Sequence, residues 1–377
     1  MIWLMQHPWL LFLLTALVSA GVCGLLIPLA APLGWMDHPD ARKRHKRVTP
    51  LIGGAAIFIA MVMALWLAPV NEWSAELFYP AVLLGGFVLL LTGLIDDMRH
   101  LSALIRLLVE AGACLWLIRY TGLRLDDFGP LFTANALDLG WLAEPITVFA
   151  ALGVINAFNL IDGADGIAGS IYVLAAGAMA AFAGWNGDSA MSVFLGVTSA
   201  AVIGFLVFNA RLPWNRRART FLGDSGSLLL GFVLAWGFIR LGSGPNRAFM
   251  PMTAVWLFAV PLLDTSTLIW SRWRDGRSAA SADQHHLHHA LLRAGFTVGQ
   301  TWGLISLFAL ALGGIGVLFQ FSGLPGYLSF YSFIALAFVY YLYIKHSWAS
   351  RVFLGHRFVR ANLELDEGLV PMVLLKP

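Results

Sequence analysis

Long apolar runs separated by short polar segments make up most of this chain. A helix needs about 20 mostly apolar residues to cross the hydrocarbon core of a membrane, and runs of that kind predict about eleven spans. The third and fifth runs are short, so their ends are the least defined. The pattern predicts an all-α, polytopic membrane helical bundle with spans at 8–31, 51–69, 80–95, 101–120, 145–159, 166–184, 190–208, 226–241, 251–271, 299–319 and 326–345.

Composition agrees with this fold class. The chain is 59% hydrophobic and 12% charged, and its mean hydropathy is +0.76. An ordinary soluble domain carries about 25% charged residues, so a soluble protein is excluded. Cys23 and Cys114 both lie in apolar runs, which indicates neither a disulfide framework nor a CxxC metal or redox site. The first run has no basic residue ahead of it, which favours a retained helix over a cleaved signal.

Positive charges predict the orientation of the spans. With the N-terminus on the periplasmic side and the C-terminus in the cytoplasm, threading the chain through eleven spans assigns each loop to one side. All but four of the 24 Lys and Arg residues then fall on the inner side, and the exceptions are Arg119, Arg124, Arg240 and Arg247. This distribution follows the positive-inside rule.

The same threading places four polar motifs on the inner face. Scattered structural polar residues have no reason to gather on one side, whereas an active site at the membrane surface requires it. We therefore predict one transmembrane catalytic domain over residues 1–345, with cytoplasmic active-site loops, and a short cytoplasmic tail over 346–377. The motifs are Asp96-Asp97, Asn156–Gly166, Gly223–Ser227 and Gln284–His289.

Two of these motifs carry paired carboxylates. Asp96 and Asp97 are adjacent, so their mutual repulsion calls for a nearby cation, either a metal or an arginine; an ordinary helix end with solvated acids is the alternative. Asp162 and Asp165 are three residues apart and share one face if their segment is helical. The alternative for that pair is buried polar packing between helices.

The segment Gly223–Ser227 is predicted to be a tight turn into the eighth span. Free amides at a helix start attract phosphate, and Asp224 offers a hard oxygen ligand for magnesium. The alternative is structural, with Asp224 or Ser225 as the N-cap of the helix.

Four histidines, His285, His286, His288 and His289, stand in one short segment. His285 and His289 would lie one turn apart on a helix and could bind zinc, but no third ligand is evident. The flanking arginines Arg272, Arg274, Arg277 and Arg293 suit phosphate better, so we favour imidazoles that donate to phosphate oxygens. Asp283 is a candidate to orient one of the rings.

Two further segments leave alternatives open. The loop from Asp37 to Gly54 contains five cations and His45, followed by Thr49-Pro50 and Gly53-Gly54. The charges either fix the orientation of the neighbouring spans or form a surface that meets anionic lipid head groups and phosphates. Asp264 lies about two turns from the inner end of the ninth span. It is either a site residue or a partner for hydroxyls such as those of Thr265 and Thr267.

Taken as a set and in this order, the motifs resemble the polyprenyl-phosphate N-acetylhexosamine-1-phosphate transferases, also called glycosyltransferase family 4. The resemblance runs from Asp37 to about Lys345 and is closest to the branch that uses UDP-GlcNAc. It rests on Asp96-Asp97, Asn156–Gly169, Phe221–Ser227, Asp283–His289 and Leu292–Thr297. It implies a magnesium-dependent phosphoglycosyl transferase of the bacterial inner membrane, which transfers GlcNAc-1-phosphate from UDP-GlcNAc to undecaprenyl phosphate and initiates a lipid-linked surface glycan such as O antigen.

The resemblance also implies roles for individual residues. Asp224 and Asn159 would hold Mg²⁺, with Mn²⁺ as a substitute, and Asp96 and Asp97 would act near the lipid phosphate, as base or as orienting groups. Asp162 and Asp165 match acids at the nucleotide-sugar end. The predicted substrate-binding residues are His285, His286, His288, His289, Lys46, Arg272 and Asn156.

The implied partners are UDP-GlcNAc, undecaprenyl phosphate and membrane lipids, with no nucleic acid; a homodimer is left open. Another UDP-aminosugar or the muramoyl-pentapeptide donor remains an alternative substrate. A transporter would place acids and histidines near the bilayer midplane rather than at one face. A lipid-binding scaffold would need the cations without the paired acids.

Overall fold

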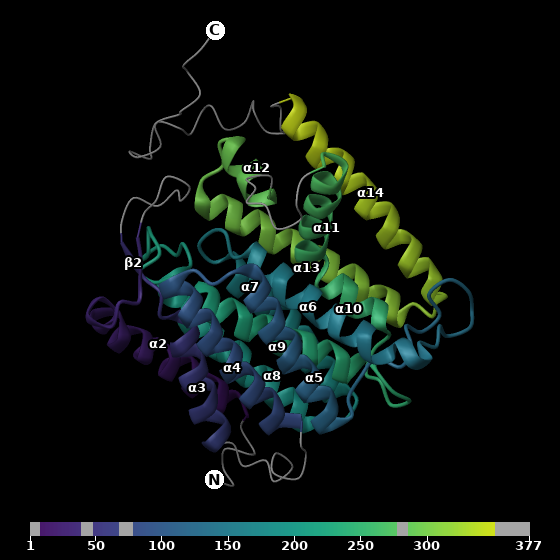
Figure 1. The fold of residues 1–377 in the computed structure, drawn as a ribbon, viewed down its shortest axis with the longest axis horizontal. Coiled ribbons are helices and arrows are strands. Elements are labelled where there is room, and N and C mark those ends of the chain that lie inside the picture. Colours follow the sequence, from purple (N-terminus) through teal and green to yellow (C-terminus); the bar gives the residue numbers. More distant parts are fainter. Residues whose placement is uncertain (1–7, 39–47, 68–77, 277–285, 351–377) are drawn as a thin grey trace.

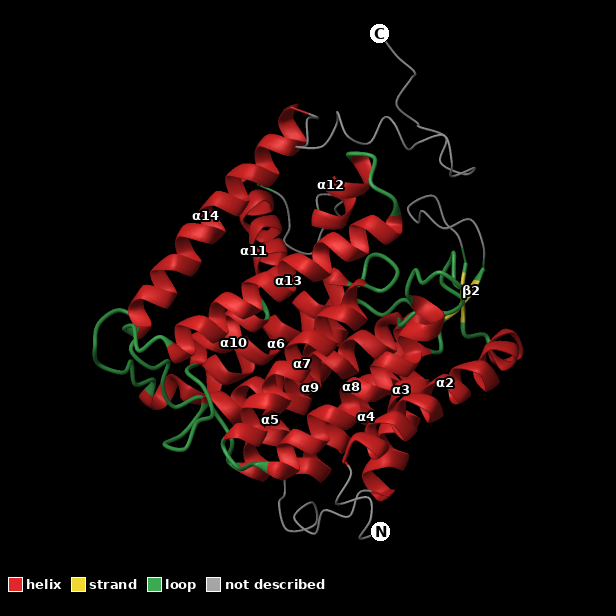
Figure 2. Cartoon of the chain, turned by 180° about the vertical axis from the view of Figure 1, so that it is seen from behind, coloured by secondary structure: helices red, strands yellow, loops and turns green. Residues whose placement is uncertain are grey.

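The computed structural model describes residues 8–38, 48–67, 78–276 and 286–350. Helices make up most of these segments, which confirms the all-α fold class (Figures 1 and 2). The α-helices of the described residues are α2 (Pro8–Leu33), α3 (Gly53–Leu67), α4 (Phe78–Arg99), α5 (Ala103–Thr121), α6 (Ala143–Ile161), α7 (Ile167–Trp185), α8 (Ser189–Asn209), α9 (Gly223–Gly242), α10 (Pro251–Leu257), α11 (Ala259–Arg274), α12 (Leu287–Arg293), α13 (Val298–Phe321) and α14 (Gly326–Ser350), and the 3-10 helix η2 (Gly140–Leu142) precedes α6.

Helix ends follow local capping chemistry. Ser102 and Asp188 are the N-caps of α5 and α8, and each accepts a hydrogen bond from a backbone amide of the first turn. Thr297 and Gln300 form a reciprocal capping box at the start of α13. Gly122 ends α5 in the left-handed conformation, with φ of 72°. The sequence therefore specifies these boundaries locally.

Helix α9 is the centre of the bundle (Figure 1). In its most apolar window 94% of the residues are buried, compared with 22% in α2 and 17% in α14. Helices α3, α4, α6 and α7 pack around α9, while α2 and α8 extend the bundle on one side. Helix α9 is enclosed by other helices, whereas α2 and α14 expose many apolar side chains, as expected of helices that face lipid.

Glycines bring α3 and α4 against the first turn of α9. A methyl group added at Gly54 would meet the backbone of Gly226, and one at Gly93 would meet the backbone of Asp224. Close approach through small residues is a common way for membrane helices to associate. Here it places the end of α4, with its paired aspartates, beside the start of α9.

Every predicted span coincides with a helix or a helix pair. Eight helices of the described segments are long and apolar enough to cross a membrane, and the pair α10 and α11 adds a ninth candidate. Helix α3 is 15 residues long, and α5 carries Arg106, Glu110 and Arg119 within its 19 residues. Length and composition alone therefore do not qualify these two, because helices that span a membrane are longer and hold few charges.

The ninth predicted span is broken. Helices α10 and α11 meet at Phe258 with a bend of 82°, so the expectation of one continuous helix over 251–271 is wrong. Helix α11 therefore leaves the direction of α10 and packs against α6, α13 and α14 (Figure 1), and its Asp264 binds the first residue of α12. The apolar pattern continues through the break and gave no sign of it.

A two-stranded sheet, β1 (Met36–Asp37) and β2 (Thr49–Pro50), is the one sheet of the described residues (Figure 2). The carbonyl of Pro50 accepts hydrogen bonds from the amide of Phe221 at 2.8 Å and from the hydroxyl of Thr220 at 3.0 Å. The turn residues at Thr49-Pro50 and Gly53-Gly54 thus tie α3 to the segment that leads into α9, which gives them a structural role.

Candidate active site

The carboxylate of Asp97 caps helix α9. Its Oδ1 accepts from the amide of Asp224 at 2.9 Å and its Oδ2 accepts from the amide of Ser225 at 3.2 Å. The helix begins at Gly223, whose φ of 74° allows this tight entry. The interpretation of Asp224 or Ser225 as the N-cap is therefore wrong. The sequence had suggested that free amides at this helix start could bind phosphate. The amides of Asp224 and Ser225 are instead engaged by Asp97.

Asp96 is fixed from two directions. Its Oδ1 accepts from the amide of Leu101 at 2.6 Å, and its Oδ2 pairs with Nη1 of Arg106 at 2.7 Å. The same Nη1 lies 3.7 Å from Oδ2 of Asp224. Arg106 therefore lies between the two carboxylates and offsets part of their mutual repulsion, and it is the cation that the paired aspartates required.

Asn159 joins Asp224 from the opposite side. Its Nδ2 donates to Oδ1 of Asp224 at 2.7 Å and to the hydroxyl of Ser227 at 2.8 Å. The two residues predicted as metal ligands thus meet directly, although one comes from the last turn of α6 and the other from the first turn of α9.

Asp162 and Asp165 lie in the turn between α6, which ends at Ile161, and α7, which begins at Ile167. The expectation that they share a helical face is wrong. Asp165 Oδ2 accepts from Nε of Arg211 at 2.6 Å and from the amide of Ala218 at 3.2 Å. Glycines in this segment favour a turn, and the contacts of Asp165 hold it against the loop between α8 and α9.

The electrostatics of this turn are unfavourable for an ionised Asp162. Burial, more than any other cause, raises the pKa of Asp162 to about 8. Three neighbouring carboxylates raise this pKa further through their negative charge, and they are Asp224, Asp97 and Asp165. Acids from α4, from α9 and from the α6–α7 turn are therefore close enough to act on one another.

The histidine segment folds onto this turn. His288 lies against Gly163, where an added methyl group would meet the imidazole, and the rings of His288 and His289 are 4.1 Å apart between centroids. His286 precedes α12, and its Nδ1 lies 2.8 Å from Oδ2 of Asp264. The structure thus brings three of the four predicted histidines together, and His285 lies outside the described residues.

The remaining predicted site residues divide into three cases. Asn156 Nδ2 donates to Oε2 of Glu110 at 2.6 Å, so this amide is engaged inside the bundle. Arg272 is buried in the last turn of α11. Lys46, like His285, lies outside the described residues. The positions of Lys46 and His285 relative to the carboxylates stay predictions.

Sequence reasoning missed three residues that organise the site. Arg106 and Arg211 were counted only as topological charges, yet they pair with Asp96 and Asp165. Asn209 accepts from the amide of Gly166 at 2.8 Å and donates to the carbonyl of Thr220 at 2.9 Å. A polar residue at the end of an apolar run was the available signal for each of them.

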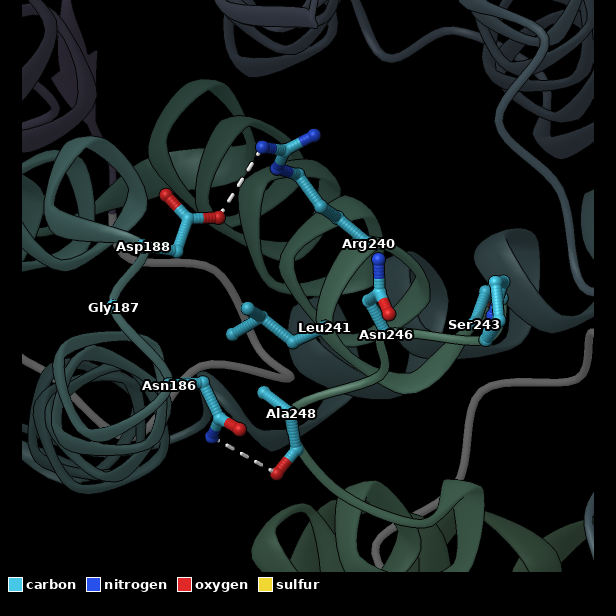
Figure 3. Close-up of a pocket in the computed structure, with 10 residues that line it drawn as sticks. Asn186, Gly187, Asp188, Arg240, Leu241, Ser243, Asn246 and Ala248 are labelled. Carbon is cyan, nitrogen blue, oxygen red and sulfur yellow. Dashed lines mark hydrogen bonds and ion pairs between the residues drawn. The ribbon is translucent and has the colours of Figure 1, made fainter.

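The cavity drawn in Figure 3 is separate from this site. It is lined by the α7–α8 turn and the segment after α9, and it contains the 3.2 Å ion pair of Arg240 with Asp188. Arg240 is 16 positions beyond Asp224 on α9, which is about 24 Å along a helix. The acids and histidines gather at one end of the bundle, whereas this cavity lies at the other.

Comparison with known proteins agrees with the motifs. The model of the family described as "Glycosyl transferase family 4" matches residues 79–242. A relative from Escherichia coli (strain K12), named undecaprenyl-phosphate alpha-N-acetylglucosaminyl 1-phosphate transferase, is 30% identical over 344 residues, or 91% of this chain and 92% of the relative. Relatives of the same name from Yersinia pestis and Haemophilus influenzae are 33% and 32% identical over 85% of this chain, and the matches cover 87% and 89% of their own lengths.

These relatives are the WecA-type transferases, the branch that the motifs resemble. The family match contains Asp96-Asp97, Asn159, the Asp162–Asp165 turn and Asp224, so it covers the residues that the structure gathers at the start of α9. Together, the family match, the all-α membrane fold and the nearly full-length similarity show that the chain belongs to glycosyl transferase family 4.

Proposed function

We propose that this protein transfers GlcNAc-1-phosphate from UDP-GlcNAc to undecaprenyl phosphate. An oxygen of the lipid phosphate attacks the sugar-bearing phosphorus, and the bond from that phosphorus to the bridging oxygen breaks. The products are undecaprenyl diphosphate GlcNAc and UMP. The relatives' shared name supports this reaction. The structural observation that carries it is the meeting of Asp96, Asp97, Asn159 and Asp224 around the start of α9.

The chemistry requires positioning more than proton transfer. A phosphate monoester has a second pKa of about 6, so the attacking group is already anionic at neutral pH. Phosphoryl transfer depends mainly on alignment and on charge neutralisation. Arg106, held between Asp96 and Asp224, is placed to orient and partly neutralise a phosphate that enters beside it. Asp96 would then position the arginine rather than act as a strong base.

The donor set fits a hard divalent ion, Mg²⁺ with Mn²⁺ as a substitute. In the segments that the structure describes, no three His, Cys, Asp or Glu side chains form a ready metal site. Magnesium is usually held by one or two carboxylates together with substrate phosphates, so a sparse protein set suits it. Asp224 and the amide oxygen of Asn159 would be its protein ligands. When bound, the ion would neutralise charge on the diphosphate oxygens.

The nucleotide sugar would lie toward the α6–α7 turn. Asp165 is held there by its contacts with Arg211 and Ala218, Asp162 lies in the same turn, and His288 packs on it at Gly163. Imidazoles beside acids and an expected diphosphate suit hydrogen-bond donation to phosphate oxygens.

The positive-inside rule supports an inner-membrane protein of eleven spans, with its N-terminus in the periplasm and its site on the cytoplasmic face. The site then lies in one domain over residues 1–345, followed by a short tail. The product would initiate a surface glycan such as O antigen. Single cysteines test this topology, because native Cys23 and Cys114 are buried. An impermeant maleimide applied to intact cells should label Thr133→Cys and not Trp214→Cys.

A UMP-release assay tests the reaction. Purified protein with UDP-GlcNAc, undecaprenyl phosphate and Mg²⁺ should release UMP, and chelation or Asp224→Ala should remove at least 99% of the rate, since loss of one transition-state group costs about 100-fold or more. Glu144→Gln, at an exposed ion pair with Arg119, is the matched control. Activity that survives both chelation and Asp224→Ala would contradict the mechanism.

Substrate competition tests the alternative donors. UDP-GalNAc and the muramoyl-pentapeptide nucleotide should support slower UMP release than UDP-GlcNAc. A preference for either one would retain the reaction type and change the sugar. Uptake of solute into vesicles without UMP release would favour a transporter instead, although the acids lie at the end of α4, at the start of α9 and in the α6–α7 turn rather than midway along a helix.

A further inference from the structure

Asp264 is a buried carboxylate at the junction of three helices, with 2% of its surface exposed. Its Oδ1 accepts from the amide of Leu287 at 2.8 Å and from the hydroxyl of Tyr340 at 3.1 Å. Its Oδ2 lies 2.8 Å from Nδ1 of His286. The sequence had suggested Thr265 and Thr267 as alternative partners, but the carboxylate is engaged by groups from α12 and α14 instead.

These contacts define the state of the His286 ring. An ionised carboxylate only accepts hydrogen bonds, so Nδ1 of His286 carries the proton that faces Asp264. The remaining ring nitrogen, Nε2, is then the one that can meet a ligand. A carboxylate that holds Nδ1–H fixes both the orientation and the tautomer of an imidazole, and it stabilises the imidazolium if a second proton is added.

The ring held in this way belongs to the candidate site. The centroids of His286 and His288 are 5.4 Å apart and the two rings are stacked with 18° between their planes. His288 in turn lies on Gly163, in the turn that carries Asp162 and Asp165. A shift in His286 would therefore move the layer of imidazoles that covers the acidic turn.

We propose that Asp264 is a positioning residue for substrate binding, which acts through His286. Its carboxylate accepts from Nδ1–H and stabilises the imidazolium, in which Nε2–H donates to an anionic oxygen of the nucleotide sugar's diphosphate. Tyr340 donates to the same carboxylate and restrains it from α14. The inference rests on the proposed function, because it assumes that a nucleotide diphosphate sugar is the donor.

Asp264→Asn is the informative substitution because it preserves shape and changes one donor. The amide oxygen of Asn can still accept from Leu287 and Tyr340. Its NH₂ group would face Nδ1 of His286 and donate to it, so the ring proton would move from Nδ1 to Nε2. The ring would then stay neutral, because it could not become an imidazolium without losing this hydrogen bond. Loss of the orienting partner of a metal-bound histidine costs about 10–100-fold in affinity or activity, and we expect the lower end of that range here.

A thermodynamic cycle separates this role from a structural one. The dissociation constant of UDP-GlcNAc would be measured by calorimetry with Mg²⁺ for the wild type, Asp264→Asn, His286→Ala and the double variant. We expect Asp264→Asn to weaken binding at least tenfold in the wild-type background and less than twofold when His286 is already Ala. Residues that act through one another give non-additive effects.

Two further variants complete the design. Tyr340→Phe removes one hydrogen bond to Asp264 and should weaken binding about threefold, again only when His286 is present; it also serves if Asp264→Asn does not fold. Asp188→Asn is the matched structural control, since Asp188 caps α8 and pairs with Arg240 at the other end of the bundle. It should lower the unfolding temperature and leave the dissociation constant unchanged.

The outcomes distinguish the inference from the proposed function. If the wild type releases no UMP from UDP-GlcNAc, the proposed function fails and the inference falls with it. If the wild type is active but Asp264→Asn weakens binding equally with and without His286, or has no effect, Asp264 is not a positioning residue and the proposed function stands.

Discussion

Arg106 is the cation on which the arrangement of the acids depends, so its removal gives the most direct test of the site. Arg106→Met keeps much of the side-chain volume and deletes the charge. It leaves Asp96, whose side chain is 5% exposed, without its partner at 2.7 Å. It also leaves Asp96 and Asp224 to repel each other without the positive charge between them.

The magnitude follows from the geometry. Two unit charges 2.7 Å apart attract by about 6 kcal/mol at an effective dielectric constant of 20. Removal of one partner from a fully buried pair costs about 3–5 kcal/mol. The Arg106 side chain is 26% exposed, so water can reach the site. We therefore expect a loss of about 2–3 kcal/mol, below the range for a fully buried pair.

Thermal unfolding in detergent, followed by tryptophan fluorescence, is the assay. At about 2 °C per kcal/mol, Arg106→Met should lower the unfolding temperature by about 4–6 °C. The double variant with Asp96→Asn should recover most of this loss, because the buried charge is then removed as well. UMP release should stay low in both variants. An equal loss of stability in the single and double variants would refute the ion-pair reasoning.

Three further predictions concern packing and pH. Gly93→Ala should destabilise the protein by about 1–3 kcal/mol and reduce UMP release, because its methyl group would meet the backbone at Asp224. Gly112→Ala is the control, since open space surrounds Gly112, and equal unfolding temperatures and rates for the two variants would contradict the close packing. Hydrogen bonds from Arg247 lower the pKa of Asp127, so this pair stabilises the fold fully above the ordinary Asp pKa of about 4 and less as the pH falls through the lowered value. The difference in unfolding temperature between the wild type and Asp127→Asn should therefore shrink in acid, and a constant difference from pH 7 to pH 2 would argue against the pair. The pKa of Asp162 is raised to about 8, so in the metal-free protein its contribution to stability falls as the pH rises from about 4 to 8. In the presence of a chelator, the unfolding temperature of Asp162→Asn should rise relative to that of the wild type across that window, and parallel pH dependences of the two unfolding temperatures would exclude this titration.

Much of the fold could be read from the sequence because the membrane imposes strict rules. A spanning segment must satisfy its own backbone hydrogen bonds and be apolar over its length, so hydropathy locates helices directly. The runs at 8–31, 190–208 and 299–319 match α2, α8 and α13 closely. The runs at 80–95 and 145–159 were too short, because polar and charged residues belong to the last turns of α4 and to the first turn of α6.

The site was predicted as a set of residues but not as an arrangement. Charge and turn residues identified Asp96, Asp97 and Asp224, and the glycines around Asp162 indicated a close approach. The sequence could not show that Asp97 caps α9 or that Asp165 pairs with Arg211, because these contacts join residues 127 and 46 positions apart. The helical face assigned to Asp162 and Asp165 failed because spacing was used where glycine content favoured a turn.

The sequence by itself determined the membrane environment, the approximate positions of the apolar helices, and the identity of the polar residues placed among them. These are properties of local composition, and they can be recognised in the sequence because polar groups are costly to place in lipid. The tertiary structure alone decided which polar groups pair, where the ninth apolar segment bends, and that Asp264 holds His286. Those outcomes depend on side-chain packing between helices distant in the chain, where small residues and hydrogen-bond geometry select one arrangement among many.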